Sequence, residues 1–320
     1  MVDKVRYGDK MVQEFSDADI VMWLKLITVG NGLGPVKLQK LLEKFNNNLD
    51  RIFNAPESEL LGLTFLNGKI INRFNELKNA NDAKFYELIE TCKKNDIKIV
   101  PFISEIYPKS LKSIPSPPLT LYLLGNVDLL KERPSIAIVG TRDPSEKAKK
   151  MAYEFSKDLA NKGILVISGG ALGIDTAAHL GSLESENKAI ISVLGSGFFH
   201  PYPPENKILF ERIVKLGGLL ISENSPNFPG ATYSFLQRNK IISGLSNSVL
   251  IVAAKETGGG LEQVKTAYTQ RKLIFCPKVM SEVLPNEGIR KAIKEYNAKE
   301  IESVEQILET VPEYMQVISN

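Results

Sequence analysis

Six short apolar runs, separated by segments with helical spacing, constrain the fold more than any other feature of this sequence. They read SIAIVGTR, GILVISGG, AIISVLG, GLLISEN, NSVLIVAA and KLIFCP, and are rich in β-branched residues. Such near-continuous runs are typical of strands buried on both faces of a parallel sheet. The helical segments between them supply the crossovers that parallel strands require. The pattern therefore predicts an α/β fold with a Rossmann-like, doubly wound, mainly parallel sheet.

The sequence before these runs predicts a separate domain. From residue 16 to residue 95 apolar residues recur at helical spacing, and Ser16 or Asp17 is suited to cap the first helix. A glycine-rich turn, VGNGLG, leads into Pro35, which the first turn of a helix tolerates. This turn offers backbone N–H groups to a phosphate, although a plain tight turn between helices is the simpler interpretation. We expect a small helical N-terminal domain of the helix-hairpin-helix or SAM-like kind, then a linking segment with short strands, then the Rossmann-like domain, over residues 1–95, 96–131 and 132–320.

Composition narrows the classes of function. Lys and Arg number 40 against 37 Asp and Glu, so the net charge of +3 neither requires nor excludes nucleic acid as a partner. Cys92 and Cys276 stand far apart and histidine occurs only at positions 179 and 200, which disfavours a zinc site and suits two buried thiols in a reducing compartment. Neither a signal-peptide core nor an apolar run of membrane-spanning length is present. We expect a cytoplasmic protein with no membrane segment.

Glycines cluster directly after the predicted strands. In an open α/β sheet, ligands bind beyond the carboxyl ends of the strands, where these turns converge. A turn without side chains lets backbone N–H groups approach an anion at a helix N-terminus. Five such turns favour an extended anionic ligand over the alternative that each glycine is there for steric reasons alone. The first three turns supply these candidates: Gly140, Thr141, Arg142, Ser145, Ser168, Gly169, Gly170, Gly173, Gly195, Gly197 and Asn206.

The segment FLQRNKIISGLS adds charge and an aromatic ring. Arg238 and Lys240 suit a phosphate backbone, and Asn239 lies between them. Phe235 in this segment and Phe228 before it suit base stacking, which tolerates any sequence. Taken alone, the segment is more typical of an amphipathic helix with a solvated basic face. Beside the glycine turns, it favours single-stranded DNA.

None of the turns matches a known nucleotide-binding or catalytic motif. GxxxxGK[ST] is absent, GTRDPS lacks the second and third glycines of GxGxxG, and GSGFFH lacks the last. Asp143, Asp175 and Glu223 are more typical of helix caps and loop braces than of metal ligands. We therefore expect no cofactor, no metal ion and no catalytic residue.

The order of several motifs resembles the DNA-processing protein A family, also called DprA or Smf. These motifs are YPKSL, LYLLGN, IAIVGTRDPS, SGGALGID, YPPEN and FLQRNKIISGLS. The resemblance implies a Rossmann-like protein that binds single-stranded DNA and helps to load a RecA-type recombinase on incoming DNA in natural transformation. It also implies a homodimer formed through residues 261–274. The family's phosphate loop falls on Gly140, Thr141, Arg142 and Ser145, its second glycine loop on residues 168–175, and its RN pair on Arg238 and Asn239.

The sequence departs from that family in places, and two alternatives stay open. Leu172 stands where many members carry a basic residue, Ala253 or Ala254 where an acidic one is usual, and the last turn reads GGGLE without a serine. TGGGLEQV also resembles nucleoside-monophosphate phosphoribohydrolases of the lysine-decarboxylase-like family, in which Glu262 and Arg142 would act on a ribosyl bond. The second alternative is a scaffold that contacts the recombinase without needing DNA.

Overall fold

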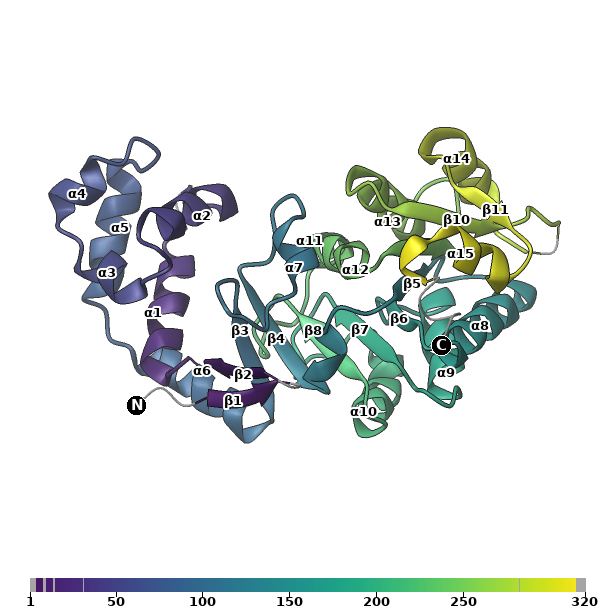
Figure 1. The fold of residues 1–320 in the computed structure, drawn as a ribbon, viewed down its shortest axis with the longest axis horizontal. Helices are drawn as coiled ribbons and strands as arrows, with labels where there is room; N and C mark the ends of the chain where they lie inside the picture. Colours follow the sequence, from purple (N-terminus) through teal and green to yellow (C-terminus); the bar gives the residue numbers. More distant parts are fainter. Residues whose placement is uncertain (1–3, 8–9, 14, 31, 282, 315–320) are drawn as a thin grey trace. The chain divides into compact units, whose positions relative to one another are not determined.

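Two compact units make up the protein. The computed structural model describes residues 4–7, 10–13, 15–30, 32–281 and 283–314. The first unit holds Met1–Tyr107 and Ser116–Leu121, and the second holds Pro108–Pro115 and Tyr122–Asn320. The first unit is mainly helical, and the second is built on a sheet with helices on both faces (Figure 1). This is the predicted class, an α/β fold preceded by a helical region.

The first unit folds around a tryptophan on its first helix. Trp23 is fully buried, and its indole N–H donates to the Thr120 hydroxyl at 2.8 Å. Ser16 caps this helix, because its hydroxyl oxygen accepts the Asp19 N–H at 3.2 Å, and Pro35 opens the second helix as predicted. The described elements of the unit are β1 (Lys4–Tyr7), β2 (Lys10–Gln13), α1 (Asp17–Thr28), α2 (Pro35–Lys44), α3 (Leu49–Asn54), α4 (Glu57–Leu61), α5 (Gly68–Lys78), α6 (Ala83–Lys94) and β3 (Ile97–Pro101).

The segment between the helical region and the six apolar runs contains the two strands that its sequence predicts. IKIVP forms β3, and TLYLLG forms β4 (Thr120–Gly125). A short helix, α7 (Lys109–Lys112), precedes the proline cluster, and a 3-10 turn, η1 (Val127–Leu130), follows β4. The Tyr107 hydroxyl donates to the Pro118 carbonyl oxygen at 2.7 Å and so fixes the proline-rich loop within the first unit.

The sheet of the second unit confirms the predicted strands. The six apolar runs form β5 (Ser135–Val139), β6 (Leu165–Ser168), β7 (Ile190–Leu194), β8 (Leu219–Ser222), β9 (Ser248–Ile251) and β10 (Leu273–Pro277). With β11 (Lys299–Ile301) and β4 they run in the order β11-β10-β9-β5-β6-β7-β8-β4. Neighbours are parallel except β4, which pairs antiparallel with β8. The order reverses at β5, and such a reversal opens a crevice at the carboxyl ends of the strands.

Helices cover both faces of this sheet (Figure 1). One face carries α8 (Glu146–Asn161), α9 (Ile174–Leu183) and α15 (Val304–Thr310), which share one apolar core with the central strands. Gly181 allows α9 to approach α8, since a Cβ there would lie 2.1 Å from the Tyr153 carbonyl oxygen. The remaining elements are η2 (Pro204–Asn206), α10 (Lys207–Lys215), α11 (Thr232–Gln237), α12 (Asn239–Leu245), α13 (Gly259–Thr269) and α14 (Glu287–Tyr296).

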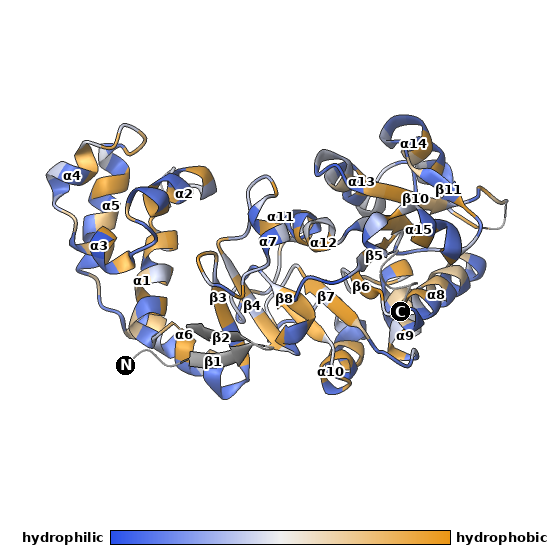
Figure 2. Ribbon diagram, in the orientation of Figure 1, coloured by the Kyte–Doolittle hydropathy of each residue, from blue (hydrophilic) through white to orange (hydrophobic). Residues whose placement is uncertain are grey.

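Hydropathy follows this layering. In Figure 2 the strands of the sheet are mostly hydrophobic, whereas the helices alternate between hydrophobic and hydrophilic residues. Cys92 and Cys276 are buried and free, as predicted, and burial raises the pKa of each thiol to about 12. Among the described helices, none combines the length and the apolar character that crossing a membrane would take.

Candidate functional site

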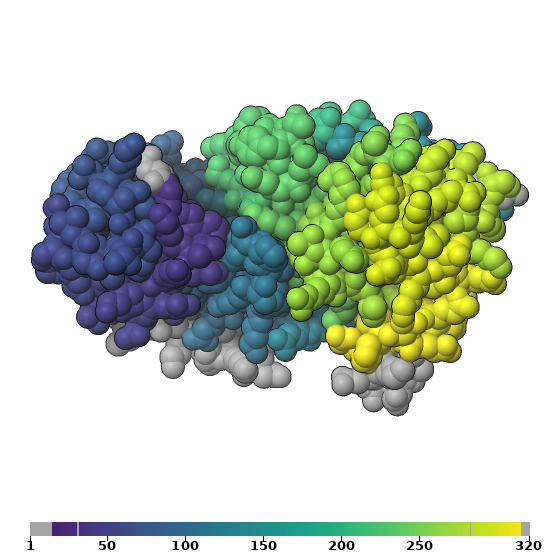
Figure 3. Space-filling model, turned by 90° about the horizontal axis from the view of Figure 1, so that it is seen from above, coloured from purple at the N-terminus to yellow at the C-terminus, as the bar shows by residue number. Residues whose placement is uncertain are grey.

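A cleft of about 440 Å³ lies at the carboxyl ends of the strands, where the strand order reverses. Residues from the turns after β5, β6, β7 and β9 line it, so four of the five turns predicted to converge do meet, whereas from the connection after β8 the lining residues lie on α11 and beyond it rather than in the predicted turn. On the face shown in Figure 3, α11 and α12 (green) lie beside α13 (yellow-green). The predicted site residues that line this cleft are Gly140, Thr141, Arg142, Phe235, Arg238 and Asn239.

The other predicted residues lie around the cleft rather than along its wall. Gly169 and Gly195 line a smaller cavity that shares Arg142, Phe235 and Arg238 with the cleft. The rest are not among the described residues that line either cavity: Ser145, Ser168, Gly170, Gly173, Gly197, Asn206, Phe228 and Lys240.

The turn after β5 carries the most accessible cation of the predicted set. The Thr141 N–H donates to the Ala253 carbonyl oxygen at 2.8 Å and fixes the start of this turn beside β9. Ser145 ends it by capping α8, since its hydroxyl oxygen accepts the Ala148 N–H at 3.3 Å. Arg142 between them is exposed, and within the part of the chain that the structure describes it has no acidic partner. Its guanidinium is therefore available to an anion in the cleft.

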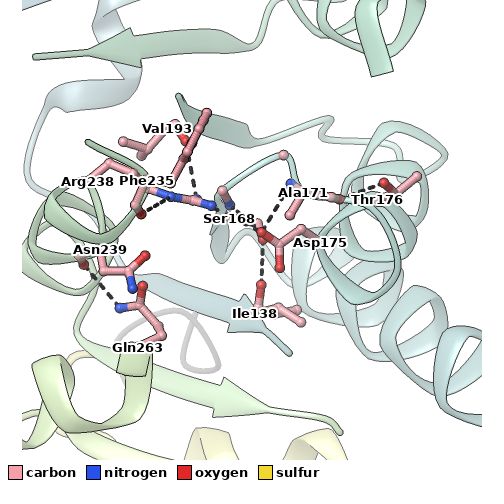
Figure 4. A network of polar contacts seen from close by, with 12 residues as sticks. Ile138, Ser168, Ala171, Asp175, Thr176, Val193, Phe235, Arg238, Asn239 and Gln263 are labelled. Atoms are coloured by element: carbon pink, nitrogen blue, oxygen red, sulfur yellow. Dashed lines mark hydrogen bonds and ion pairs between the residues drawn. The ribbon is translucent and has the colours of Figure 1, made fainter. Parts of the chain in front are cut away.

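A buried carboxylate braces the turn after β6. Asp175 accepts the N–H groups of Gly169 and Ala171 at 3.1 and 3.3 Å (Figure 4). Burial raises the pKa of the Asp175 carboxyl, and Arg238 and the two N–H donors oppose that rise. Asn206 holds the same turn from the other side, donating to the Gly170 carbonyl oxygen at 2.9 Å. The backbone N–H groups of Gly169 and Ala171 are therefore already bound by this chain and are not free for a phosphate.

Several glycines of the predicted site exist because the turns pack on one another. A Cβ at Gly169 would lie 1.2 Å from the Arg238 guanidinium, and one at Gly195 would lie 2.5 Å from the Phe235 ring. Phe235 on α11 and Arg238, which joins α11 to α12, thus occupy the space that these two glycines leave. The steric interpretation, which the sequence left open for each glycine, accounts for both positions.

Arg238 and Lys240, predicted to contact phosphate, both have partners within the protein. Arg238 is 7% exposed and donates to the carbonyl oxygens of Val193 and Phe235, each at 3.3 Å (Figure 4). Its guanidinium lies 4.0 Å from the Asp175 carboxylate, and burial lowers its pKa. Lys240 forms an ion pair with Glu223 at 2.9 Å. Arg238 thus holds the turns together, while only part of its surface faces the cleft.

Two aromatic rings flank the cleft, and the sequence predicted one of them. Phe235 is half-buried, and its ring centroid lies 4.9 Å from that of Tyr202, which is 44% exposed. Tyr202 lines the cleft from the turn after β7, and was not among the predicted site residues. Phe228 faces elsewhere: its ring lies 6.4 Å from that of Tyr233, and its carbonyl oxygen accepts the Gly197 N–H at 2.8 Å.

The turn between β9 and α13 also lines the cleft, although the predicted site left it out. Lys255, Thr257 and Gly258–Gly260 contribute from this turn, and Gln263 from the first turns of α13. Gln263 donates from its amide nitrogen to the Asn239 carbonyl oxygen at 3.1 Å (Figure 4). The glycine run was the available signal for this turn, whereas nothing in the sequence marked Gln263.

The geometry gives little support to a ribosyl-cleaving site. Glu262, the candidate carboxylate, pairs with Lys265 at 2.6 Å and is not among the described residues that line the cleft. In the described ranges, His, Cys, Asp and Glu side chains form no group of three that could hold a metal ion. Among the described lining residues, the cleft offers backbone donors, a guanidinium without an acidic partner, a lysine beside the exposed Asp143 carboxylate, and a pair of aromatic rings.

Comparison with known proteins gives one consistent result. A sequence profile described as "DNA recombination-mediator protein A" matches residues 98–312. The DNA processing protein DprA of Bacillus subtilis is 35% identical over 231 residues, covering 72% of this chain and 76% of that protein. The protein Smf of Synechocystis is 33% identical over 267 residues, covering 81% of this chain and 65% of its own.

Two solved structures share the architecture. The X-ray structure of DNA processing protein A from Streptococcus pneumoniae superposes with a TM-score of 0.76 at 27% identity, covering 93% of this chain and 99% of that one. A structure of DNA processing protein A from Helicobacter pylori, described for its single-stranded DNA binding mode, gives a TM-score of 0.59 at 27% identity, covering 67% of this chain and 94% of that one.

Proposed function

This chain belongs to the DNA recombination-mediator protein A family, and from that premise we propose that its cleft binds single-stranded DNA with little preference for sequence. One observation carries the proposal: the exposed Arg142 and the neighbouring rings of Tyr202 and Phe235 line the same cleft. A free guanidinium attracts a phosphate, and aromatic rings accept an unpaired base of any kind.

The cleft suits an unpaired strand better than a duplex. Its described lining comes from turns that follow separate strands and from parts of α11, α12 and α13, so its cations Arg142, Arg238 and Lys255 lie in separate segments rather than along one helix that could enter a major groove. A base in a duplex is already paired and stacked, and reaching Tyr202 would cost the energy of leaving that stack. The Helicobacter pylori relative, described by its single-stranded DNA binding mode, supports the same choice.

The test is a comparison of single-stranded and double-stranded DNA at several salt concentrations. Labelled oligo-dT is titrated with the protein, and unlabelled duplex and mixed-sequence strands are added as competitors. We expect single strands of different sequence to compete similarly, duplex to compete poorly, and affinity to fall as salt rises. Duplex that displaces oligo-dT as well as a single strand does would contradict the proposal.

We also propose the cellular process in which DNA binding by the cleft takes part. Family membership supports a recombination mediator in the cytoplasm that helps to load a RecA-type recombinase on incoming DNA during natural transformation, and that acts as a homodimer. The measurement is recombinase filament growth on a single strand covered by a competing binding protein. We expect this protein to accelerate the growth, and a cleft variant that has lost DNA binding to give no acceleration.

We also propose that the cleft binds without catalysis. The ion pair between Glu262 and Lys265 supports this, because it engages the only carboxylate that the enzymatic alternative names. Incubation with nucleoside monophosphates is expected to release no free base. Release that disappears in a Glu262→Gln variant would favour the phosphoribohydrolase alternative instead.

A further inference from the structure

The start of α13 contains a glycine that the fold does not require. At Gly140, Gly169 and Gly195 a Cβ would lie closer than 3 Å to another part of this chain. Gly259 differs: it is the first residue of α13, its φ is not positive, and a Cβ there would meet no atom within 4 Å. Glycine also weakens a helix relative to alanine. Packing and backbone conformation therefore leave this glycine unexplained, and it lies in the wall of the cleft.

Three backbone donors at this helix start are unused. The first bond of α13 runs from the Glu262 N–H to the Gly258 carbonyl oxygen at 3.1 Å. Among the described residues, no partner is found for the N–H groups of Gly259, Gly260 and Leu261, and Gly258 has no side chain to cap them. Such donors at the N-terminus of an eleven-residue helix form an anion site, aided by the helix dipole.

A buried acceptor beside these donors points independently to a ligand. Gln263 is 2% exposed and lines the cleft. It lies three and four residues after Gly260 and Gly259, on the same face of α13. Its amide nitrogen donates to Asn239, but its carbonyl oxygen has no partner in the part of the chain that the structure describes. A buried acceptor without a donor is unfavourable, so a ligand that brings a donor as well as an anion would satisfy it.

The charges around the site distinguish a terminal phosphate from an internal one. Arg142 and Lys255 line the same cleft, as does Asp143, whose exposed carboxylate lies 3.8 Å from Lys255. Two cations and a helix N-terminus match about two negative charges. An internal phosphodiester carries one charge and two free oxygens, whereas a terminal phosphate carries close to two charges and three acceptor oxygens. Three N–H donors fit three oxygens.

We propose that the Gly258–Gly260 turn binds the terminal phosphate of a nucleoside 5′-monophosphate unit, while Gln263 accepts a hydrogen bond from the same nucleotide. That unit is either the 5′-phosphorylated end of a strand or a free nucleotide, since both present the same chemistry. The inference rests on the proposed function, because it specifies which nucleotide of a single strand the cleft holds.

The first test compares oligo-dT carrying a 5′-phosphate with oligo-dT carrying a 5′-hydroxyl. We expect the phosphorylated strand to bind about tenfold tighter, as charge-assisted hydrogen bonds would give. Gly259→Asp should remove the difference, because a carboxylate there repels the phosphate while suiting the helix start. Gly68→Asp is the matched control: Gly68 is the first residue of α5, its Cβ also meets nothing within 4 Å, and it lies outside the cleft. Thermal unfolding of both variants checks their folding, and Gly259→Ala replaces Gly259→Asp if the latter does not fold.

A second test separates the two sources and keeps this inference distinct from the proposed function. Deoxythymidine monophosphate and thymidine are used as competitors of the labelled strand. Competition by deoxythymidine monophosphate but not by thymidine assigns the site to a free nucleotide. Tighter binding of the 5′-phosphorylated strand without such competition assigns the site to a strand end. Both outcomes support the inference. Oligo-dT that binds equally with and without a 5′-phosphate, with no effect of the monophosphate, overturns the inference and leaves the proposed function intact. Failure to bind either strand overturns the proposed function.

Discussion

Two arginines line the cleft, and their surroundings give them different roles. Arg142 is exposed and has no acidic partner among the described residues, so a phosphate can approach it at little cost. Arg238 is 7% exposed and is bound to two carbonyl oxygens beside Asp175. A buried guanidinium is tolerated only because such partners replace water. Sequence alone assigned both to phosphate, because it does not show which arginine lies beneath the turns.

Replacing Arg142 tests the exposed member of this pair. Arg142→Ala should weaken oligo-dT binding for every sequence and reduce the steepness of log affinity against log salt by about 0.7, the value for one phosphate on a single strand. The control is Arg133→Ala, an exposed arginine just before β5 and so at the opposite end of that strand. Binding is followed by fluorescence anisotropy at several salt concentrations. An unchanged slope in a folded Arg142→Ala protein removes this residue from the site.

Aromatic stacking is tested with two rings of which only one lines the cleft. Tyr202→Ala should lower the affinity for oligo-dT about tenfold, because base stacking on an aromatic side chain is worth about 1–3 kcal/mol. Phe228→Ala should leave affinity unchanged, since its ring lies against Tyr233 instead. Both are titrated at one fixed salt concentration. Equal losses in the two variants would show that folding, not stacking, is what the substitutions disturb.

At the scale of elements, the connection from β6 to α9 positions the turn that carries Arg142. Gly173 has a φ of +81°, and a Cβ there would lie 2.5 and 2.7 Å from the carbonyl oxygens of Thr141 and Arg142. Both obstacles are backbone atoms, so neither can rotate away as the end of a side chain can. The turn after β5 therefore lies in tight contact with the residue that precedes α9, which fixes the first turn of the cleft.

Gly173→Ala should destabilise the protein and weaken DNA binding together. The added methyl group needs a positive φ and a displaced Arg142 turn, and we expect a loss of about 1–3 kcal/mol in the free energy of unfolding. Urea unfolding followed by circular dichroism measures the loss. Gly259→Ala offers the contrast, because open space surrounds its Cβ and stability should not fall. A Gly173→Ala protein as stable as the parent would show that the turn adapts freely.

Helix α13 is where family resemblance places a dimer contact, and the structure divides its residues into two sets. Leu261, Val264 and Ala267 are buried within the second unit, whereas Tyr268 is 47% exposed. The Tyr268 ring meets that of Tyr296 on α14 edge to face, with centroids 5.5 Å apart. An interface formed by this helix would therefore use the tyrosine pair and not the buried Leu261, Val264 and Ala267.

The corresponding prediction concerns association. We expect the protein to be a dimer at tens of micromolar by light scattering, and Tyr268→Asp to shift it to monomer, because a carboxylate would be buried without a partner at the interface. Circular dichroism should show the variant to be folded, since Tyr268 lies at the surface. A parent protein that is monomeric at these concentrations argues against the contact.

For the whole molecule, one buried histidine contributes to how stability responds to acid. His179 on α9 is fully buried, and burial, reinforced by Arg238, lowers its pKa from 6.5 to about 3. As the pH falls, His179 therefore binds a proton near pH 6.5 in the unfolded chain, whereas in the folded chain it binds one only near pH 3. Because the unfolded state holds more protons in this window, the free energy of unfolding falls as the pH falls, by up to about 1.4 kcal/mol per pH unit.

His179→Leu should remove that slope between pH 6 and pH 4. Thermal unfolding across this range, compared with the parent, gives the measurement. His200, the other histidine, is exposed, so His200→Gln serves as the control and should retain the parent's slope. A parent and a His179→Leu protein with the same pH dependence would show that other groups, not this imidazole, govern acid stability.

The whole-molecule architecture was predictable, while the composition of the cleft was only partly so. The alternation of apolar runs with helical segments predicts the sheet and its helices, because strands that are buried on both faces consist almost entirely of apolar residues. The β1–β2 hairpin was missed, since its strands, KVRY and KMVQ, lack the near-continuous apolar run that marks the strands of the large sheet. Tyr202 and Gln263 were missed because each acts through neighbours distant in sequence, Phe235 and Asn239. The domain boundaries stay a prediction.

The position of β5 in the sheet has a consequence for how the chain is made. This central strand pairs on one side with β6, which follows it closely, and on the other with β9, which leaves the ribosome only after β6, β7 and β8. Throughout that interval one edge of this buried strand has no neighbour, and an open apolar edge favours pairing with other chains. The nascent protein is therefore expected to be most prone to aggregation before β9 is made and pairs with β5.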